Sequence, residues 1–247
     1  MHYIPDFLCD DLDAFEKQNP HPVPCNRDHL SKCVEFKYSE DFGEWKEEFP
    51  DRVNPPAIHT RSLFFHHADH LIGVDVRWIR SFTDVVQLEV AACWDHDHYR
   101  RPFAPFHGLS STVKSLSMVW RDLPSSDVFP FICSFSHLVD LHVAGKGQVQ
   151  NIGGDWTISP LPPLTGSIVL GTSTSDFVHQ LLKQPNNLHF KKIVWQKLPK
   201  KSFEGVADLV EKCSGVLECI EIDFGMSAES LPYTPAISPV SICRTSG

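Results

Sequence analysis

A six-residue pattern that recurs at nearly constant intervals is the feature that most constrains how this chain can fold. The pattern has apolar residues at its first, fourth and sixth positions, and residues 138–143 and 85–90 are clear copies. Taking the fourth position as an anchor, successive anchors lie 25, 28, 25, 27, 25 and 27 residues apart. The anchors are Leu63, Leu88, Leu116, Leu141, Ile168, Ile193 and Ile220.

A step of this size is typical of a leucine-rich-repeat array, so the sequence predicts an α/β fold. We expect a right-handed solenoid of about seven repeats, whose strands form a curved parallel sheet with helices and loops on the convex side. Each repeat buries its apolar face against its neighbours, which favours one continuous domain. The expected domain covers residues 30–224, between an irregular acidic leader at 1–29 and a Pro/Ser-rich tail without regular structure at 225–247.

The segments between the anchors predict both helices and loops. Residues 71–82 carry apolar side chains at helical spacing, and residues 125–135, 175–182 and 203–210 each combine a capping residue with one apolar face. We place Pro130 in the first turn of its helix, where proline is tolerated. Residues 33–38 read as a first strand, followed by a helix capped by Asp41. Residues 93–111 and 144–163 hold several prolines or glycines and read as irregular crossovers.

Charge and composition exclude several classes of protein. The net charge is −9, and residues 1–50 alone hold 12 acidic against 5 basic side chains. An acidic chain without a basic stripe argues against a nucleic-acid surface and fits protein partners better. No stretch approaches the roughly 18 apolar residues that span a membrane, and the N-terminus lacks the pattern of a secretory signal. We therefore expect an intracellular protein, cytoplasmic or nuclear.

The chain has eight cysteines, and none of them forms a C-x-x-C pair. Cys133 and Cys213 fall on apolar helix faces, and Cys33 and Cys219 lie inside strand patterns. Such positions favour reduced, buried cysteines that act as small apolar residues. A disulfide framework is the alternative interpretation.

Several blocks of sequence resemble a known family. They are SFTDVVQLEV at 81–90, PFICSFSHLVDL at 130–141, LTGSIVL at 164–170 and LHFKKI at 188–193. They resemble the leucine-rich-repeat regions of F-box-type proteins of mushroom-forming fungi, and the resemblance covers roughly residues 55–225. In that family an N-terminal F-box docks to the adaptor of a cullin ubiquitin ligase, and the repeats hold a substrate. This chain has no recognisable F-box, so the resemblance implies contact with the adaptor only if residues 1–29 are a disguised one.

Catalytic motifs are missing from the sequence: there is no nucleophile elbow, P-loop or dinucleotide-binding fingerprint. We therefore predict a non-enzymatic protein with no catalytic residue, no bound metal and no cofactor. One alternative is a metal-binding protein or enzyme built on either of two His/Asp clusters, because imidazole and carboxylate are competent zinc ligands. Another is a truncated remnant without a partner. The clusters are His66, His67, Asp69 and His70, and Asp95, His96, Asp97 and His98.

The remaining candidate is a binding surface. In the repeating pattern, the residues between the apolar positions face the concave side of the sheet, where repeat solenoids bind proteins. They form two columns, one beginning at Gln87 and the other at Glu89, and we expect Val169 and Val194 to be exposed within the second. The predicted partner-binding residues are Gln87, Glu89, Ser115, Ser117, Asp140, His142, Lys192, Val194 and Glu221.

Overall fold

The computed structural model describes residues 32–49, 55–66, 68–71, 77–93, 103–121, 125–146, 161–162, 164–171, 174–183, 188–196, 203–223 and 240–243. These residues form an α/β structure built on one nine-stranded sheet whose strands follow one another in sequence order. Strands β1 to β8 are parallel, and β9 is antiparallel to β8. The strands are β1 (Cys33–Phe36), β2 (Ser62–Phe65), β3 (Gln87–Cys93), β4 (Ser115–Arg121), β5 (Asp140–Lys146), β6 (Ser167–Leu170), β7 (Lys192–Trp195), β8 (Cys219–Ile222) and β9 (Val240–Cys243).

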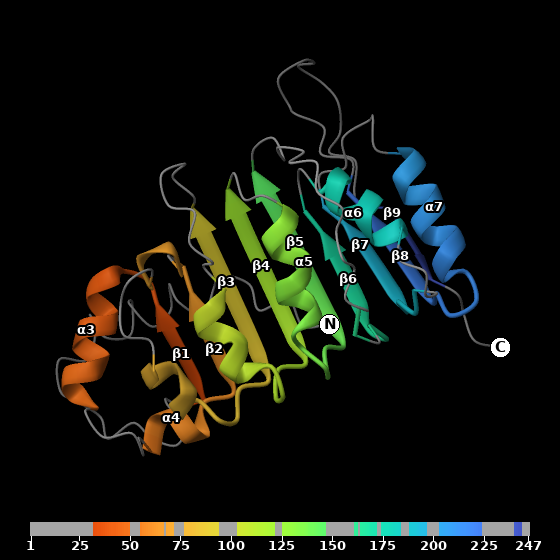
Figure 1. Ribbon diagram of the computed structural model, residues 1–247. Helices are drawn as coiled ribbons and strands as arrows, with labels where there is room; N and C mark the ends of the chain where they lie inside the picture. The colour runs from red at the N-terminus through yellow and green to blue at the C-terminus, as the bar shows by residue number, and fades with distance from the viewer. Residues whose placement is uncertain are drawn as a thin grey trace, which may run out of the picture.

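Helices connect most of the successive strands along the chain, and those drawn in Figure 1 lie over one face of the sheet. In Figure 1, α3 lies at the β1 end of the row of strands and α7 lies at the end formed by β8 and β9. The α-helices are α3 (Ser39–Glu48), α4 (Pro55–His59), α5 (Ser125–Cys133), α6 (Ser175–Leu182) and α7 (Phe203–Cys213), and the 3₁₀ helices are η1 (Ala68–Leu71), η2 (Arg77–Ser81) and η3 (Ala104–Leu109).

Pairing between strands places the predicted anchors opposite one another. Leu63 pairs with Leu88, Leu88 with Leu116, and Leu116 with Leu141. The series continues through Ile168, Ile193 and Ile220. All of them except Ile220 are at most 1 % exposed and belong to one core with the apolar faces of the helices. The spacing of the pattern therefore predicted the register of the parallel strands correctly.

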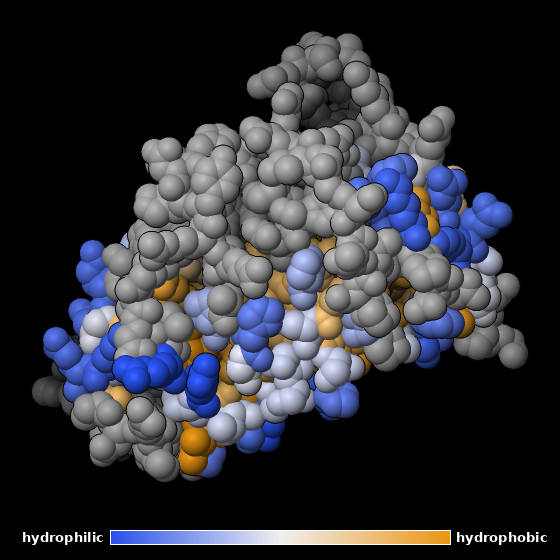
Figure 2. Space-filling view, viewed as in Figure 1, coloured by the Kyte–Doolittle hydropathy of each residue, from blue (hydrophilic) through white to orange (hydrophobic). Residues whose placement is uncertain are grey.

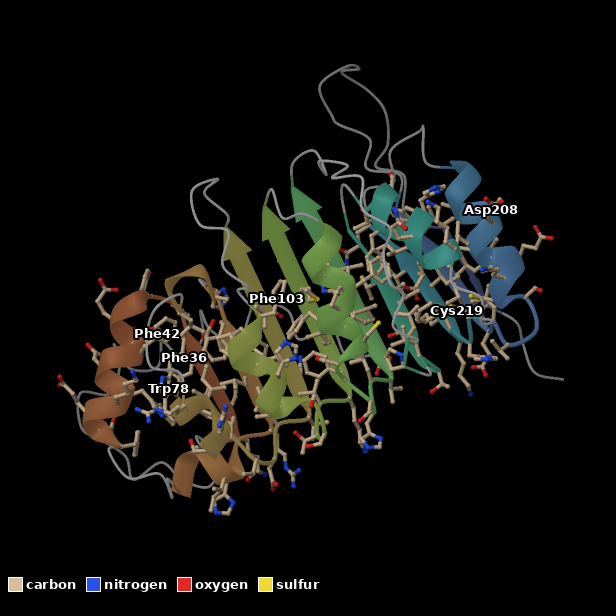
Figure 3. All side chains as sticks on the ribbon, in the orientation of Figure 1. Phe36, Phe42, Trp78, Phe103, Asp208 and Cys219 are labelled. Carbon is tan, nitrogen blue, oxygen red and sulfur yellow. A yellow bond between two sulfur atoms is a disulfide. The ribbon has the colours of Figure 1, made fainter. Side chains whose placement is uncertain are left out.

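The N-terminal end of the core is aromatic. Phe36 on β1 lies 5.3 Å from Phe42 on α3 and 5.0 Å from Phe65 on β2, measured between ring centroids. Trp78 of η2 contacts the same ring of Phe36, at 5.3 Å. These rings join α3 and η2 to the first two strands, so the sheet begins with a packed helix layer. Figure 3 shows Phe36, Phe42 and Trp78 gathered at this end of the molecule.

Asp41 supports the start of α3, although the helix begins before it. The Asp41 carboxylate accepts hydrogen bonds from the backbone N–H groups of Lys37 and Tyr38, at 2.6 and 2.9 Å. The helix starts at Ser39, so Asp41 lies in its first turn and not at the cap. A carboxylate there is also favoured by the helix dipole.

Four predictions about segments outside the repeated strands are wrong. Residues 93–111, which we expected to be an irregular crossover, contain η3. The segment expected as one helix over 71–82 contains η2, and residues 72–76 lie outside the described residues. Pro130 lies inside α5, beyond the first turn where we expected it. The tail expected to lack regular structure contributes β9. Its short sequence carries no repeat anchor, so the 25-to-28-residue period could not reveal it.

The cysteines also differ from the prediction. The sulfur atoms of Cys219 and Cys243 are bonded to each other, whereas we expected reduced cysteines. The bond forms because antiparallel pairing of β8 and β9 places these two residues directly opposite each other. Cys33 is exposed, Cys133 is partly buried and Cys213 is buried as expected.

Hydrophilic side chains gather over α3 and α7 at the two ends of the face that Figure 2 shows, with apolar residues visible between them.

Across the described part of the chain, every helix is too short or too polar to traverse a lipid bilayer.

Candidate functional site

The predicted binding residues lie on the sheet face opposite the core, which we call the ladder face. They alternate along each strand with the buried anchors, because successive side chains of a strand point to opposite faces. Pairing aligns them into two columns across the sheet. The first column contains Cys33, Ser62, Gln87, Ser115, Asp140, Ser167, Lys192 and Cys219, and the second contains Glu35, Phe64, Glu89, Ser117, His142, Val169, Val194 and Glu221.

Neighbouring strands exchange hydrogen bonds along the first column. The Ser62 hydroxyl donates to Gln87 Oε1 at 3.2 Å. Further along, Asp140 Oδ1 accepts two hydrogen bonds of 2.7 Å, one from the backbone N–H of Ser167 and one from its hydroxyl. A charged acceptor with two donors is a strong arrangement, which fixes the Asp140 side chain on the face.

Ser117 and His142 form the central pair of the second column. Ser117 Oγ lies 3.1 Å from His142 Nδ1, and Ser117 is only 9 % exposed. Burial lowers the pKa of His142 below its usual value, so the imidazole is neutral at physiological pH. His142 Nε2 is inaccessible to solvent and has no hydrogen-bond partner within the described residues.

Charged pairs lie toward both ends of the second column. Lys192 Nζ lies 2.6 Å from Glu221 Oε1, and both side chains are partly exposed. At the other end, Glu35 Oε1 lies 2.6 Å from His66 Nε2, and Glu35 Oε2 lies 3.5 Å from Lys37 Nζ. The sequence assigned His66 to a candidate metal cluster and left Glu35 out of the binding surface. Glu35 lies within β1 and pairs with Phe64, so continuing the second column onto the first strand would have included it.

Exposure along the ladder face is uneven. Val169 is only 4 % exposed, so our prediction of an exposed Val169 is wrong. Gln87, Glu89, Ser115, Asp140, Lys192, Val194 and Glu221 are all partly exposed. The accessible part of the ladder face is therefore mostly polar, with Phe64 and Val194 as partly exposed apolar members. The carboxylates of Glu35, Glu89, Asp140 and Glu221 outnumber its one lysine in the described columns.

The two extremes of the predicted binding set lie far apart. Glu89 is on β3 and Glu221 is on β8, with four strands between them. At a strand spacing of about 4.8 Å, that places them roughly 24 Å apart across the sheet. No small ligand contacts both, so a partner that uses the whole surface must be a macromolecule or an extended segment of one.

The candidate metal clusters fall mostly outside the described residues. His67 and residues 95–98 lie there, and Asp69 and His70 are described only in their backbone. Among the residues whose side chains are described, no three His, Cys, Asp or Glu groups lie close enough to hold a metal ion. The leader at 1–29 is also outside the described part.

Comparison with protein-family models, with curated proteins and with solved structures finds no significant match to this chain.

Proposed function

We propose that this chain is a right-handed leucine-rich-repeat solenoid of about seven repeats that acts as a non-enzymatic protein–protein interaction module. The observation that carries the proposal is the alignment of polar and charged side chains into two columns on the face opposite the core. Repeat solenoids use such columns for binding, because neighbouring repeats present equivalent positions in a continuous row.

Pre-organisation of the side chains supports a binding role. Asp140 is fixed by Ser167, and Lys192 is paired with Glu221. Side chains that are already ordered lose little conformational entropy when a partner binds. The excess of carboxylates on this face favours a partner with a basic surface, since complementary charge speeds encounter and selects partners.

By resemblance, the proposed role is that of the substrate-recognition repeats of an F-box-type ubiquitin-ligase adaptor, acting inside the cell. The substrate is then a protein held on the ladder face. Within these 247 residues, the leader at 1–29 is the segment that could serve as an F-box for direct contact with the cullin-ligase adaptor. A stable interface buries roughly 1,200–2,000 Å², and that leader offers only scattered apolar residues such as Phe7, Leu8, Leu12 and Phe15 among prolines and acids.

Affinity purification of the full chain, followed by mass spectrometry of the proteins retained, tests the proposal. The informative variant is Glu89→Lys with Glu221→Lys, which reverses two charges on the ladder face. The matched control is Glu44→Lys with Glu211→Lys, two exposed residues of α3 and α7, because it changes the net charge equally on the opposite side. We expect the first variant to lose the partner and the control to keep it.

A partner lost equally with both variants would contradict the assignment of the ladder face, because net charge alone would then explain binding. A second experiment addresses the ligase. We expect purified cullin adaptor not to be retained by this chain. Retention that disappears when residues 1–29 are deleted would show that the leader is a disguised F-box.

A further inference from the structure

The edge strand β9 is attached to the sheet by backbone pairing with β8 and by a covalent bond. It has four residues and is hydrogen-bonded to β8, the last parallel strand. Ile242 is 66 % exposed, and Cys243 is exposed as well. Ile220 and Ile222 lie on β8, the strand that pairs with β9. They are only partly buried, whereas the residues at the equivalent positions of the other parallel strands are buried. Ile242 therefore contributes little apolar burial to the attachment of β9.

The bond between Cys219 and Cys243 is the covalent part of this attachment. The two residues are directly opposite each other in the antiparallel pair, 24 residues apart in sequence. Cys219 belongs to the first column of the ladder face, where Lys192 is its neighbour on β7. Its sulfur lies 4.0 Å from Glu221 Oε1, the oxygen that pairs with Lys192. Figure 3 shows Cys219 at this end of the sheet, near α7.

We propose that the Cys219–Cys243 disulfide is a redox latch: it holds β9 on the edge of β8 when oxidised, and reduction by a dithiol releases β9. One thiolate of the reductant attacks the sulfur of Cys243, an exposed residue, which forms a mixed disulfide with Cys243 and expels Cys219 as a thiolate. The second thiol of the reductant then attacks the reductant sulfur that is bonded to Cys243. This step closes a disulfide within the reductant and expels Cys243 as a thiolate. The protein disulfide gains two electrons and two protons, and the dithiol becomes a disulfide.

Release of β9 follows from what remains after reduction. A disulfide stabilises mainly by lowering the conformational entropy of the chain between its cysteines in the unfolded state. Breaking the bond therefore removes this stabilisation of the paired strand. A four-residue strand that pairs with a single neighbour is held by few backbone hydrogen bonds, and the exposed Ile242 adds little burial to them. With β9 released, β8 becomes the edge of the sheet and its outward N–H and C=O groups lose their partners.

Hydrogen exchange of the full chain, with and without dithiothreitol, tests the latch. We expect reduction to raise amide exchange in peptides covering β8 and β9 by about tenfold or more, since a disulfide closing a loop of this length stabilises by more than that factor. Exchange in β5, at the centre of the sheet, should stay unchanged. Unaltered exchange in β9 after complete reduction would overturn the proposal, because the backbone ladder alone would then hold the strand.

Differential alkylation first establishes the bond itself. Trypsin leaves residues 213–244 as one peptide that carries Cys213, Cys219 and Cys243, since it contains no internal lysine or arginine. In protein denatured without reductant, only Cys213 should be alkylated, and the other two cysteines should follow after reduction. Alkylation of all three before reduction, in protein purified in air, would also overturn the proposal.

Two serine variants complete the test. Cys243→Ser should show the fast exchange of β8 and β9 with or without dithiothreitol. The control, Cys33→Ser, removes another exposed cysteine at the opposite end of the sheet and should keep the response of the unmodified protein. Equal exchange in Cys243→Ser and the oxidised unmodified protein would contradict the latch, because it would show that the bond does not retain β9.

Discussion

Leu116 on β4 and Leu141 on β5 lie directly opposite each other, although 25 residues separate them in the chain. Both are at most 1 % exposed. The same relationship links each anchor to the next, and every anchor except Ile220 is buried in one core with the helix layer. Damage to one anchor in the middle of the sheet should therefore affect strands on both sides.

Leu141→Asp should unfold or severely destabilise the protein. The change removes apolar burial and places a charge in the core, at a cost of at least about 3–5 kcal/mol, which is a large part of typical domain stability. Thermal and urea unfolding followed by circular dichroism measures the loss. Thr165→Asp, at an exposed position before β6, is the control and should change stability little. An unchanged melting curve for Leu141→Asp would show that the assigned register is wrong.

Two glycines should respond in opposite directions to the same substitution. A Cβ at Gly166 would meet the Asp140 carboxylate and come within 2.9 Å of the Val139 carbonyl oxygen. Gly166→Ala should therefore destabilise by about 1–3 kcal/mol, as overpacking does. Gly43, inside α3, has nothing within 4 Å of such a Cβ. Gly43→Ala should stabilise by up to about 1 kcal/mol through helix propensity.

Urea unfolding of both glycine variants against the unmodified protein checks this pair. Equal effects at the two positions would mean that strand β5 does not approach Gly166 as closely as the structure shows.

The parallel sheet could be predicted from sequence because its determinants are local and periodic. Each anchor, such as Leu88 or Ile193, is an apolar residue at a fixed place in a six-residue pattern, and the equal steps fix which anchors pair. Helices α6 and α7 could be predicted equally well, because each segment carries apolar side chains at helical spacing. The 3₁₀ helix η2 could not, since Trp78 has the same spacing as in an α-helix and its aromatic neighbours come from distant segments.

The ladder face could be predicted as a set of positions, but not as a set of contacts. The alternation of the strands assigned Ser117 and His142 to the same column, and pairing places them side by side. Nothing local in the sequence indicates that Ser117 and Val169 are nearly inaccessible, because that depends on the surrounding chain. Strand β9 and its disulfide could not be predicted either. The segment returns antiparallel to β8 and does not carry the repeated pattern, so the periodicity of the sequence does not reveal it.

Stability should fall as the pH drops below about 6.5, in part because of His142. Burial disfavours the imidazolium, so the pKa of His142 in the folded protein lies below its unfolded value of about 6.5. Between these two pKa values the unfolded chain binds more protons than the folded one. The contribution of His142 is therefore complete above the unfolded pKa and is lost as the pH falls toward the folded one.

Urea unfolding at neutral pH and at about pH 5 measures this dependence. His142→Gln should reduce the difference between the two conditions, whereas His179→Gln, an exposed change on α6, should leave it as it is. An identical pH dependence in His142→Gln and the unmodified protein would show that the imidazole is not held neutral by the fold.

Two carboxylates of the ladder face should differ in what they contribute to stability. Asp140 accepts two short hydrogen bonds from Ser167, one of them from its backbone N–H, so Asp140→Ala leaves that part-buried donor unsatisfied and should cost about 1.5–3 kcal/mol. Glu221 forms an ion pair that water and salt screen, so Glu221→Ala should cost no more than about 1 kcal/mol. Denaturant midpoints of the two variants, measured at low and at high salt, test the contrast, and only the Glu221 effect should shrink at high salt. If Glu221→Ala proves as costly as Asp140→Ala, the ion pair with Lys192 is part of the framework of the sheet, and a Glu221 variant would no longer be a suitable probe of partner binding.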